Sequence, residues 1–148
     1  MADGRLWFLL AGSLSLLAAL LHLACIVGGP DWYRMMGAGD DLANAAARGA
    51  WFPALITAVI SAILLVWSAY AFSAAGIGPV LPLRRTALVL ITLVLTLRGL
   101  AILVPDMWRP DLSFAFKMWS SVAVLILAAC FAIGIMQSWL SLSPKDPV

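Results

Sequence analysis

The sequence contains no glutamate, and its acidic side chains lie outside its long apolar segments. All seven are aspartates: Asp3, Asp31, Asp40, Asp41, Asp106, Asp111 and Asp146. Proton-coupled and cation-coupled transporters commonly hold an ionisable group within a span, where it binds the coupling ion. The missing mid-membrane carboxylate therefore argues against an antiporter driven by a buried carboxylate.

Cysteine and histidine are scarce as well. Cys25 and Cys130 lie in apolar segments and form no C-x-x-C pair, which argues against a disulfide-exchanging oxidoreductase. His22 is the single histidine, so one chain cannot provide bis-histidine haem ligation. No cluster of histidine, cysteine and carboxylate residues has the spacing of a zinc site. The sequence predicts no metal and no cofactor.

Motifs of several enzyme classes are missing too. The chain has no G-x-S-x-G, no H-E-x-x-H and no glycine-rich phosphate loop. Its net charge of +2 is small and dispersed, so no nucleic-acid partner is expected. These absences favour a protein that is not an enzyme.

The chain does contain long apolar segments, since 64% of its residues are hydrophobic and only 11% are charged. These segments cover residues 6–27, 51–72, 86–104 and 118–140. Each is long enough as an α-helix to cross a hydrocarbon core of about 30 Å. The sequence therefore predicts an all-α membrane protein, a single domain over residues 1–148 built as a four-transmembrane-helix bundle.

The distribution of cations predicts the orientation. One side of the predicted bundle carries compact cations close to the span ends, namely Arg5, Arg84, Arg85 and Lys145. The loops on the other side mix cations with aspartates, and their cations are Arg34, Arg48, Arg109 and Lys117. Because cytoplasmic loops are enriched in Lys and Arg, we expect both termini in the cytoplasm of a bacterial cell, with the protein in its inner (plasma) membrane.

The two loops on the outer side begin alike, with the pattern P-D-x-aromatic-R at residues 30–34 and again at 105–109. One interpretation is a duplication, which would relate two helical hairpins by a pseudo-two-fold axis along the membrane normal. The other is that proline ends a helix, aspartate caps the next turn, and tryptophan with arginine anchors the interface. The sequence leaves both open.

The longer of these loops has the features of a short helix at residues 41–48. Asp40 stands where it can cap the first turn, and Arg48 stands at the end, so both charges suit the helix dipole. We expect this segment either to lie on the outer leaflet as an interfacial helix or to form an ordered loop.

Two ionisable residues fall inside the predicted spans, and they lie at matching depths. His22 precedes Gly28 and Arg98 precedes Val104 by six residues, about 9 Å of helix. Arg98 is the strongest single candidate for a functional site, because a charge within a span usually faces the bundle interior or a wet cavity. The alternatives are that Arg98 extends to the head groups or pairs with an aspartate.

The alternative for His22 is a hydrogen bond between helices, to a hydroxyl such as that of Thr57 or Ser121. Such a bond would make the histidine part of the packing between spans. As a functional group, the same imidazole would instead contact a ligand or transfer a proton.

The ionisable residues of the spans and their borders gather toward the outer side, whereas the inner half is apolar. The candidate ligand-binding residues are Arg98, His22, Asp31, Asp106, Arg34, Arg109 and Lys117. This asymmetry predicts a cavity that opens outward, polar at its mouth and apolar at its base. It would suit an amphipathic molecule with an anionic or carbonyl head, such as a lipid, an isoprenoid or a quinone.

Three functions follow from this hypothesis, in order of preference. The first is binding or transport of an amphipathic small molecule or lipid through the outward cavity. The second is an accessory or assembly subunit, whose outer charges meet a partner membrane protein or another copy of the chain. The third is an intramembrane enzyme that uses His22 as an acid or base. Membrane lipids are expected partners in every case.

Overall fold

The structure is a computed structural model, and it describes residues 4–104 and 112–142. Over these residues the fold is all-α, with five α-helices, one short 3-10 helix and no strand. The elements are α1 (Arg5–Met35), α2 (Asp40–Ala47), α3 (Phe52–Ala74), α4 (Arg84–Leu100), η1 (Ala101–Leu103) and α5 (Phe114–Ser138). Four of the helices are long and apolar enough to cross a membrane: α1, α3, α4 continued by η1, and α5.

Many large apolar side chains on these helices are exposed. Leu93 and Leu97 on α4, for example, are 52% and 61% exposed, and Val66 on α3 is 53% exposed. A soluble monomer rarely leaves a continuous apolar surface of this kind in water, whereas the hydrocarbon of a bilayer covers it without cost. The chain is a small integral membrane protein with four candidate spans.

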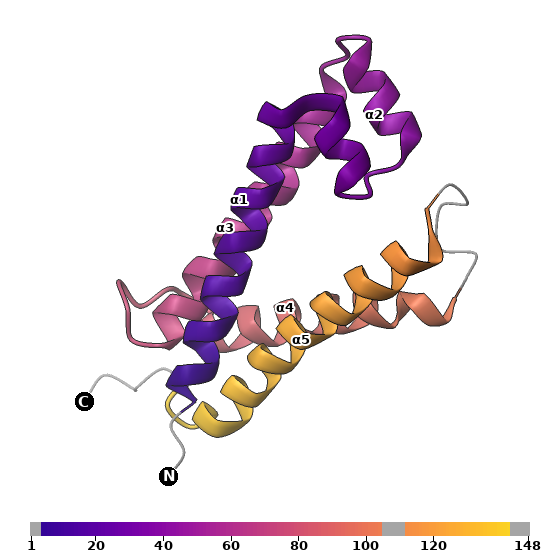
Figure 1. Cartoon of the computed structure of the whole chain (residues 1–148). Helices are drawn as coiled ribbons and strands as arrows, with labels where there is room; N and C mark the ends of the chain where they lie inside the picture. The colour runs from indigo at the N-terminus through magenta and orange to yellow at the C-terminus, as the bar shows by residue number, and fades with distance from the viewer. Residues whose placement is uncertain (1–3, 105–111, 143–148) are drawn as a thin grey trace.

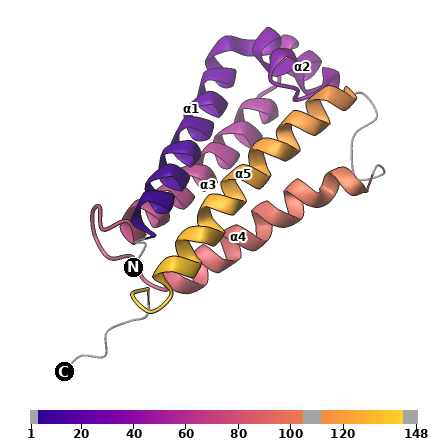
Figure 2. The ribbon, with the colours of Figure 1, turned by 60° about the horizontal axis from the view of Figure 1, so that its bottom comes forward.

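The long helices pack as two antiparallel pairs. α1 packs most extensively against α3, and α4 packs most extensively against α5. Figure 1 shows the two pairs meeting near the start of α1 and separating toward the end of the bundle that carries α2. In Figure 2 the same pairs lie side by side, with the beginning of α5 next to α2 and its connections. We call these two ends of the bundle the Gly4 end and the α2 end.

The apolar core lies at the Gly4 end. From α1 the cluster of buried apolar side chains includes only Phe8 and Ala11, both fully buried. A Cβ placed on Gly134 of α5 would lie 2.9 Å from Cε1 of Phe8, so the ring fills the space that the glycine leaves. The remaining buried members of this cluster are Ala71, Ala75, Leu88, Ile91, Leu95, Leu127, Ala128, Cys130, Phe131, Ile135 and Leu142.

Small and hydroxyl side chains join α1 to α3. Ser61 donates a 2.9 Å hydrogen bond to the carbonyl oxygen of Ala19, and Ser68 donates a 2.8 Å bond to that of Gly12. The ring of Phe72 packs over Gly12, where a Cβ would lie 2.9 Å from it. Because lipid tails are as apolar as the helices, close packing and interhelical hydrogen bonds must hold such a pair together.

The connection between α3 and α4 is tied to both neighbouring helices. The Ser73 hydroxyl donates to the carbonyl oxygen of Pro79 at 2.8 Å and accepts from the amide of Leu81 at 3.1 Å. Arg84 donates to the carbonyl oxygens of Ser73 and Ser141, at 3.2 and 3.3 Å. The guanidinium thus links the end of α3, the start of α4 and the segment after α5 at the Gly4 end.

The observed helices begin and end near the predicted apolar segments, with one large difference. The straight part of α1 ends at Gly28, near the predicted residue 27, and the difference is a second helical segment that follows the kink at Gly29 and ends at Met35. A short helix, α2, occupies Asp40–Ala47, where residues 41–48 were predicted. The second copy of the P-D-x-aromatic-R pattern, residues 105–109, lies outside the described residues, so the pseudo-two-fold duplication stays a prediction.

Candidate functional site

The α2 end begins with a bend in α1 at Gly29. This glycine has φ 69° and ψ −154°, in the left-handed half of backbone space, where side chains other than glycine are disfavoured. Pro30 follows, and its fixed φ suits the first position of a new helical turn. The ring of Trp32 folds back over Gly28, in the space that a Cβ would occupy. The bend therefore depends on two adjacent glycines and a proline.

α2 folds back against the bent segment of α1. Its Ala43 is fully buried and joins Tyr33 and Cys25 in a small apolar cluster, separate from the core at the Gly4 end. Gly39 precedes α2 with φ 87°, and Asp40 and Asp41 stand in its first turn, where carboxylates suit the helix dipole. The cluster fixes α2 on the same hairpin as α1.

Arg34 links α1 to α2. Its Nη1 donates to Oδ1 of Asp31 at 3.2 Å, and its Nη2 donates to Oδ1 of Asn44 at 2.8 Å. Its Nε lies 3.8 Å from Oδ1 of Asp40, an ion pair without a close hydrogen bond. The Arg34 side chain is 43% exposed, so each ion pair is worth at most about 1 kcal/mol and mainly orients the guanidinium.

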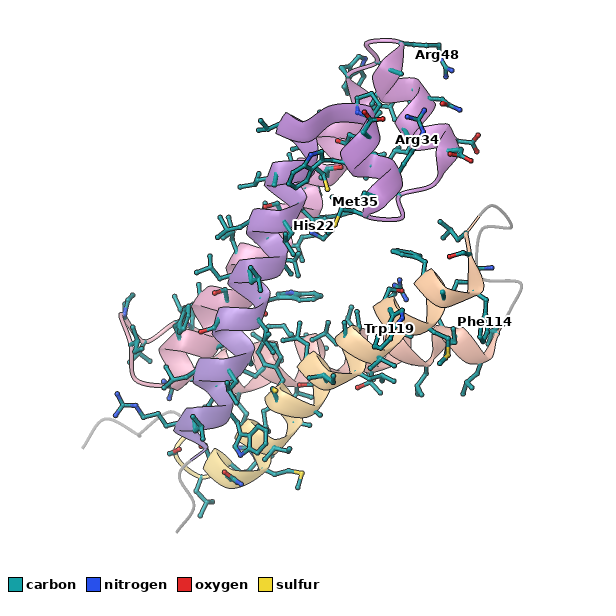
Figure 3. The ribbon with its side chains drawn as sticks, in the orientation of Figure 1. His22, Arg34, Met35, Arg48, Phe114 and Trp119 are labelled. Carbon is teal, nitrogen blue, oxygen red and sulfur yellow. The ribbon has the colours of Figure 1, made fainter. Side chains whose placement is uncertain are left out.

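A pocket of about 270 Å³ lies beside Arg34, between the two hairpins. One wall comes from the connection between α1 and α2, and the other comes from the beginning of α5. Figure 3 shows this region, with Arg34 and Met35 on the first hairpin and Phe114 and Trp119 on α5. The lining residues are Arg34, Met35, Gly37, Gly39, Asp40, Leu112, Ser113 and Phe116. The pocket combines one cation and one carboxylate with apolar side chains.

Ser113 fixes the start of α5 at the edge of the pocket. Its side-chain oxygen accepts a 3.2 Å hydrogen bond from the amide of Phe116, which is the usual bond of a helix N-cap. This bond fixes the first turn of α5, from which both Ser113 and Phe116 reach the pocket. The α5 wall therefore has a defined geometry.

Among the predicted ligand-binding residues, Arg34 lines the pocket, and Asp31 accepts a hydrogen bond from the Arg34 side chain. Asp31 is 95% exposed and does not itself line the pocket. Asp106 and Arg109 lie outside the described residues. The structure therefore brings together one predicted residue, Arg34, with partners that had not been selected from the sequence.

His22 lies deeper, about two turns before the kink of α1 at Gly29. Its Nδ1 lies 2.7 Å from the carbonyl oxygen of Ala18, so the ring bonds within its own helix. Thr57 likewise donates to Pro53 of its own helix at 2.8 Å, and the Ser121 hydroxyl is buried without a hydrogen-bond partner among the described residues. The expected bond between His22 and a hydroxyl of another helix is not present in this arrangement.

Arg98 and Lys117 lie on the second hairpin. Arg98 stands in the last turn of α4 with an exposed side chain, next to Gly99, which packs against Leu125 of α5. Lys117 is half-buried in the first turns of α5. Neither residue lines the pocket, and His22 does not line it either. A role for these three residues in ligand binding stays a prediction.

Three of the pocket residues have no feature that would single them out in the sequence. Gly37 and Gly39 read as ordinary loop glycines, and Phe116 lies in an apolar segment where aromatic residues are common. Only Ser113 follows a recognisable pattern, because serine before an apolar helix is a frequent N-cap. These residues are close because two distant segments fold onto each other. The periodicity of apolar residues along the sequence does not predict such a contact.

The described residues contain no group of three or more histidine, cysteine, aspartate or glutamate side chains that could hold a metal ion. Cys25 and Cys130 are buried free thiols in different helices. The chain matches no known protein-family model, curated protein or solved structure. Its function must therefore be argued from the pocket and the surfaces around it.

Proposed function

We propose that the protein binds an amphipathic small molecule or lipid, with the head group in the pocket at the α2 end and the apolar tail along the helices. The observation that carries this proposal is the lining of the pocket. Arg34 and Asp40 provide charged groups, whereas Met35, Leu112 and Phe116 provide an apolar surface. A molecule with a polar head and an apolar tail matches both.

The size of the pocket supports a head group rather than a whole ligand. Its volume of about 270 Å³ is below the 300–1,000 Å³ of sites that enclose a drug-sized molecule. A lipid, isoprenoid or quinone tail would therefore lie outside it, against apolar side chains that already face hydrocarbon. Moving such a tail from the bilayer to the protein surface would cost little free energy, because both surroundings are apolar.

The charges of the pocket restrict the head group. Two of the five N–H groups of Arg34 donate to Asp31 and Asn44, and the remaining ones can donate to a ligand oxygen. Asp40 can accept from a ligand hydroxyl or ammonium group at the same site. Because these two charges cancel, the site favours a carbonyl-bearing or zwitterionic head over one with several negative charges.

The first test is substitution of Arg34. Arg34→Leu removes the donors and should reduce retention of the co-purified ligand roughly ten- to a hundredfold, since a hydrogen bond to a charged group is worth about 1.5–3 kcal/mol. Native mass spectrometry of the detergent-extracted protein, with identification of the released molecule, measures this retention. The thermal stability should change little, because the ion pairs of Arg34 are exposed.

The matched control is Arg48→Leu. Arg48 follows α2 at the same end of the molecule, is exposed, and does not line the pocket. Figure 3 shows it at the far side of α2 from α5. Retention that falls equally in both variants, or in neither, would contradict a specific role for the pocket.

The orientation is a second part of the proposal, with the α2 end outside and the Gly4 end in the cytoplasm. Arg84 and Arg85 stand in the first turn of α4, and the guanidinium carbon of Arg85 lies 3.2 Å from the ring centroid of Trp139. Adjacent arginines at a helix start, one of them stacked on an interfacial tryptophan, are typical of a cytoplasmic boundary. The same side would carry both termini.

Cysteine labelling tests this orientation. In a background without Cys25 and Cys130, a cysteine at Ala47 should react with a membrane-impermeant maleimide added to intact cells. A cysteine at Val80, which is 78% exposed at the other end of the bundle, should react only after the membrane is opened. The reverse labelling pattern would show that the α2 end faces the cytoplasm.

The alternative function, an accessory subunit, is favoured by a different observation. The outer face of α5 carries an apolar hollow of about 410 Å³, lined by Phe114, Ala115, Met118, Trp119 and Val122. Trp119 and Phe114 are 75% and 73% exposed there, and exposed aromatic residues frequently anchor protein interfaces. A single stoichiometric partner that co-purifies with the chain and is lost in Trp119→Ala, while Arg34→Leu retains it, would support this function.

A further inference from the structure

At the α2 end, the ring of Phe116 on the second hairpin contacts Gly37 of the first. A Cβ built on Gly37 would overlap the ring of Phe116, so the ring lies directly on the glycine backbone. Gly37 has φ 73°, which suits a residue without a side chain. This contact joins the connection between α1 and α2 to the first turn of α5, and both residues line the pocket.

At the Gly4 end, by contrast, the hairpins are held by many contacts. The core cluster draws on all four long helices there, and Phe8 is fully buried against Gly134. Arg84 adds hydrogen bonds to the ends of α3 and α5. Figure 1 shows the pairs separating from this end toward the α2 end. The two hairpins therefore share a buried core at the Gly4 end, whereas they diverge toward the α2 end.

Phe116 also occupies a particular place in the pocket. Of the α5-side residues that line it, namely Leu112, Ser113 and Phe116, it lies furthest along the chain toward the Gly4 end. It stands about 4.5 Å beyond Ser113 along the helix axis. Phe116 therefore marks the edge of the pocket on the α5 side that is nearest to the Gly4 end.

We propose that Phe116 is the gate of this pocket: its ring on Gly37 closes the pocket toward the space between the hairpins, and its departure opens a lateral path for an apolar tail. The inference rests on the proposed function, because it assumes a ligand whose head occupies the pocket. The gate itself is a contact between two hairpins and exists without a ligand. The conformational part of the proposal can therefore be tested alone.

The first measurement is the separation of the hairpins in delipidated protein. Spin labels on cysteines at Ala47 of α2 and Ala115 of α5, both exposed positions, report it as a distance distribution. In the native sequence the distribution should be narrow, and in Phe116→Ala it should broaden and move to longer distances. Phe116→Tyr keeps the ring and should keep the narrow distribution.

Two further variants keep this test decisive. Gly37→Ala displaces the ring from the opposite side of the contact, so it should reproduce the effect of Phe116→Ala. Phe114→Ala removes an equal ring from the same helical turn, but Phe114 is 73% exposed and does not line the pocket. An unchanged distribution in both Phe116→Ala and Gly37→Ala, or an equal shift in Phe114→Ala, would overturn the gate.

The second measurement is the release of a lipid probe from nanodisc-held protein. A phosphatidylethanolamine with a pyrene-labelled chain, followed by energy transfer from tryptophan, should leave Phe116→Ala roughly tenfold faster than the native chain. An unchanged release rate together with a widened distance distribution would overturn the gating role of the ring. If the native chain binds neither this probe nor any co-purified molecule, the proposed function fails, while the distance measurement still decides whether Phe116 closes the hairpins.

Discussion

Gly134→Leu is expected to lower the thermal unfolding temperature of the detergent-extracted protein by roughly 10 °C, from an overpacking cost of about 3 kcal/mol. The first carbon of the new side chain would already lie 2.9 Å from Phe8 Cε1 and 3.0 Å from Cδ1. The ring cannot move aside easily, because Phe8 has no exposed surface. The two hairpins must then separate at the Gly4 end, where they share the buried core.

The control for this prediction is Ala129→Leu. Ala129 lies five residues before Gly134 on α5, and its side chain is exposed on the surface of the bundle. A leucine there would face hydrocarbon and should leave the unfolding temperature almost unchanged. A similar decrease in both variants would mean that α5 tolerates no added volume anywhere, and the contact between Phe8 and Gly134 would lose its special role.

Ser68→Leu is expected to disrupt the pairing of α1 with α3, and Ser68→Ala is expected to disturb it far less. Alanine removes only the 2.8 Å hydrogen bond to Gly12, and such bonds within membranes average about 0.6 kcal/mol. Leucine also forces a branched side chain into a site that is 3% exposed, which adds about 1–3 kcal/mol. The close approach of the helices should therefore matter more than the hydrogen bond.

Thermal unfolding of the two Ser68 variants measures this difference directly. Ala69→Leu, one residue further along α3, adds the same volume at an exposed position and should have little effect. If Ser68→Ala were as damaging as Ser68→Leu, the hydrogen bond itself would dominate the pairing. Equal stability of all three variants would show that α1 and α3 do not need this contact.

The four long helices could be predicted from the sequence because a span has a simple physical requirement. A segment without charges that covers about 30 Å at helical rise has few other stable structures. The pairing of helices left a weaker signal, since Ser61 and Ser68 stand seven residues apart and face Ala19 and Gly12. Small residues at such spacing favour close helix packing, and this pattern could have indicated the first pair.

The extra helical turn at the end of α1 could not be inferred in the same way. Glycines followed by proline usually end a helix, and here they end the straight part of α1, but a second helical segment begins at Pro30. What continues the helix is tertiary packing: Tyr33, 3% exposed, lies against Ala43 of α2. The sequence contains both residues, but nothing local in it relates one to the other.

The candidate site was predicted only in part. The sequence predicted that ionisable residues gather toward the outer side of the bundle, which stays a prediction, and the structure shows that Asp31, Arg34 and Asp40 lie together at the α2 end. His22 and Arg98 lie at equal depth in two spans, but neither lines the pocket. The depth of a residue along a helix does not determine which face of the helix it occupies. Gly37 and Phe116 meet through the tertiary fold alone.

The divergence of the two hairpins makes the molecule wider at the α2 end than at the Gly4 end (Figure 1). A wedge of this form is sensitive to the lateral pressure of the surrounding lipid, because widening at the α2 end displaces area from one leaflet only. Any force that compresses that leaflet favours the closed hairpins, and any force that relaxes it favours the separated ones. Membrane curvature and lipid shape would then shift the equilibrium between the closed and the separated hairpins.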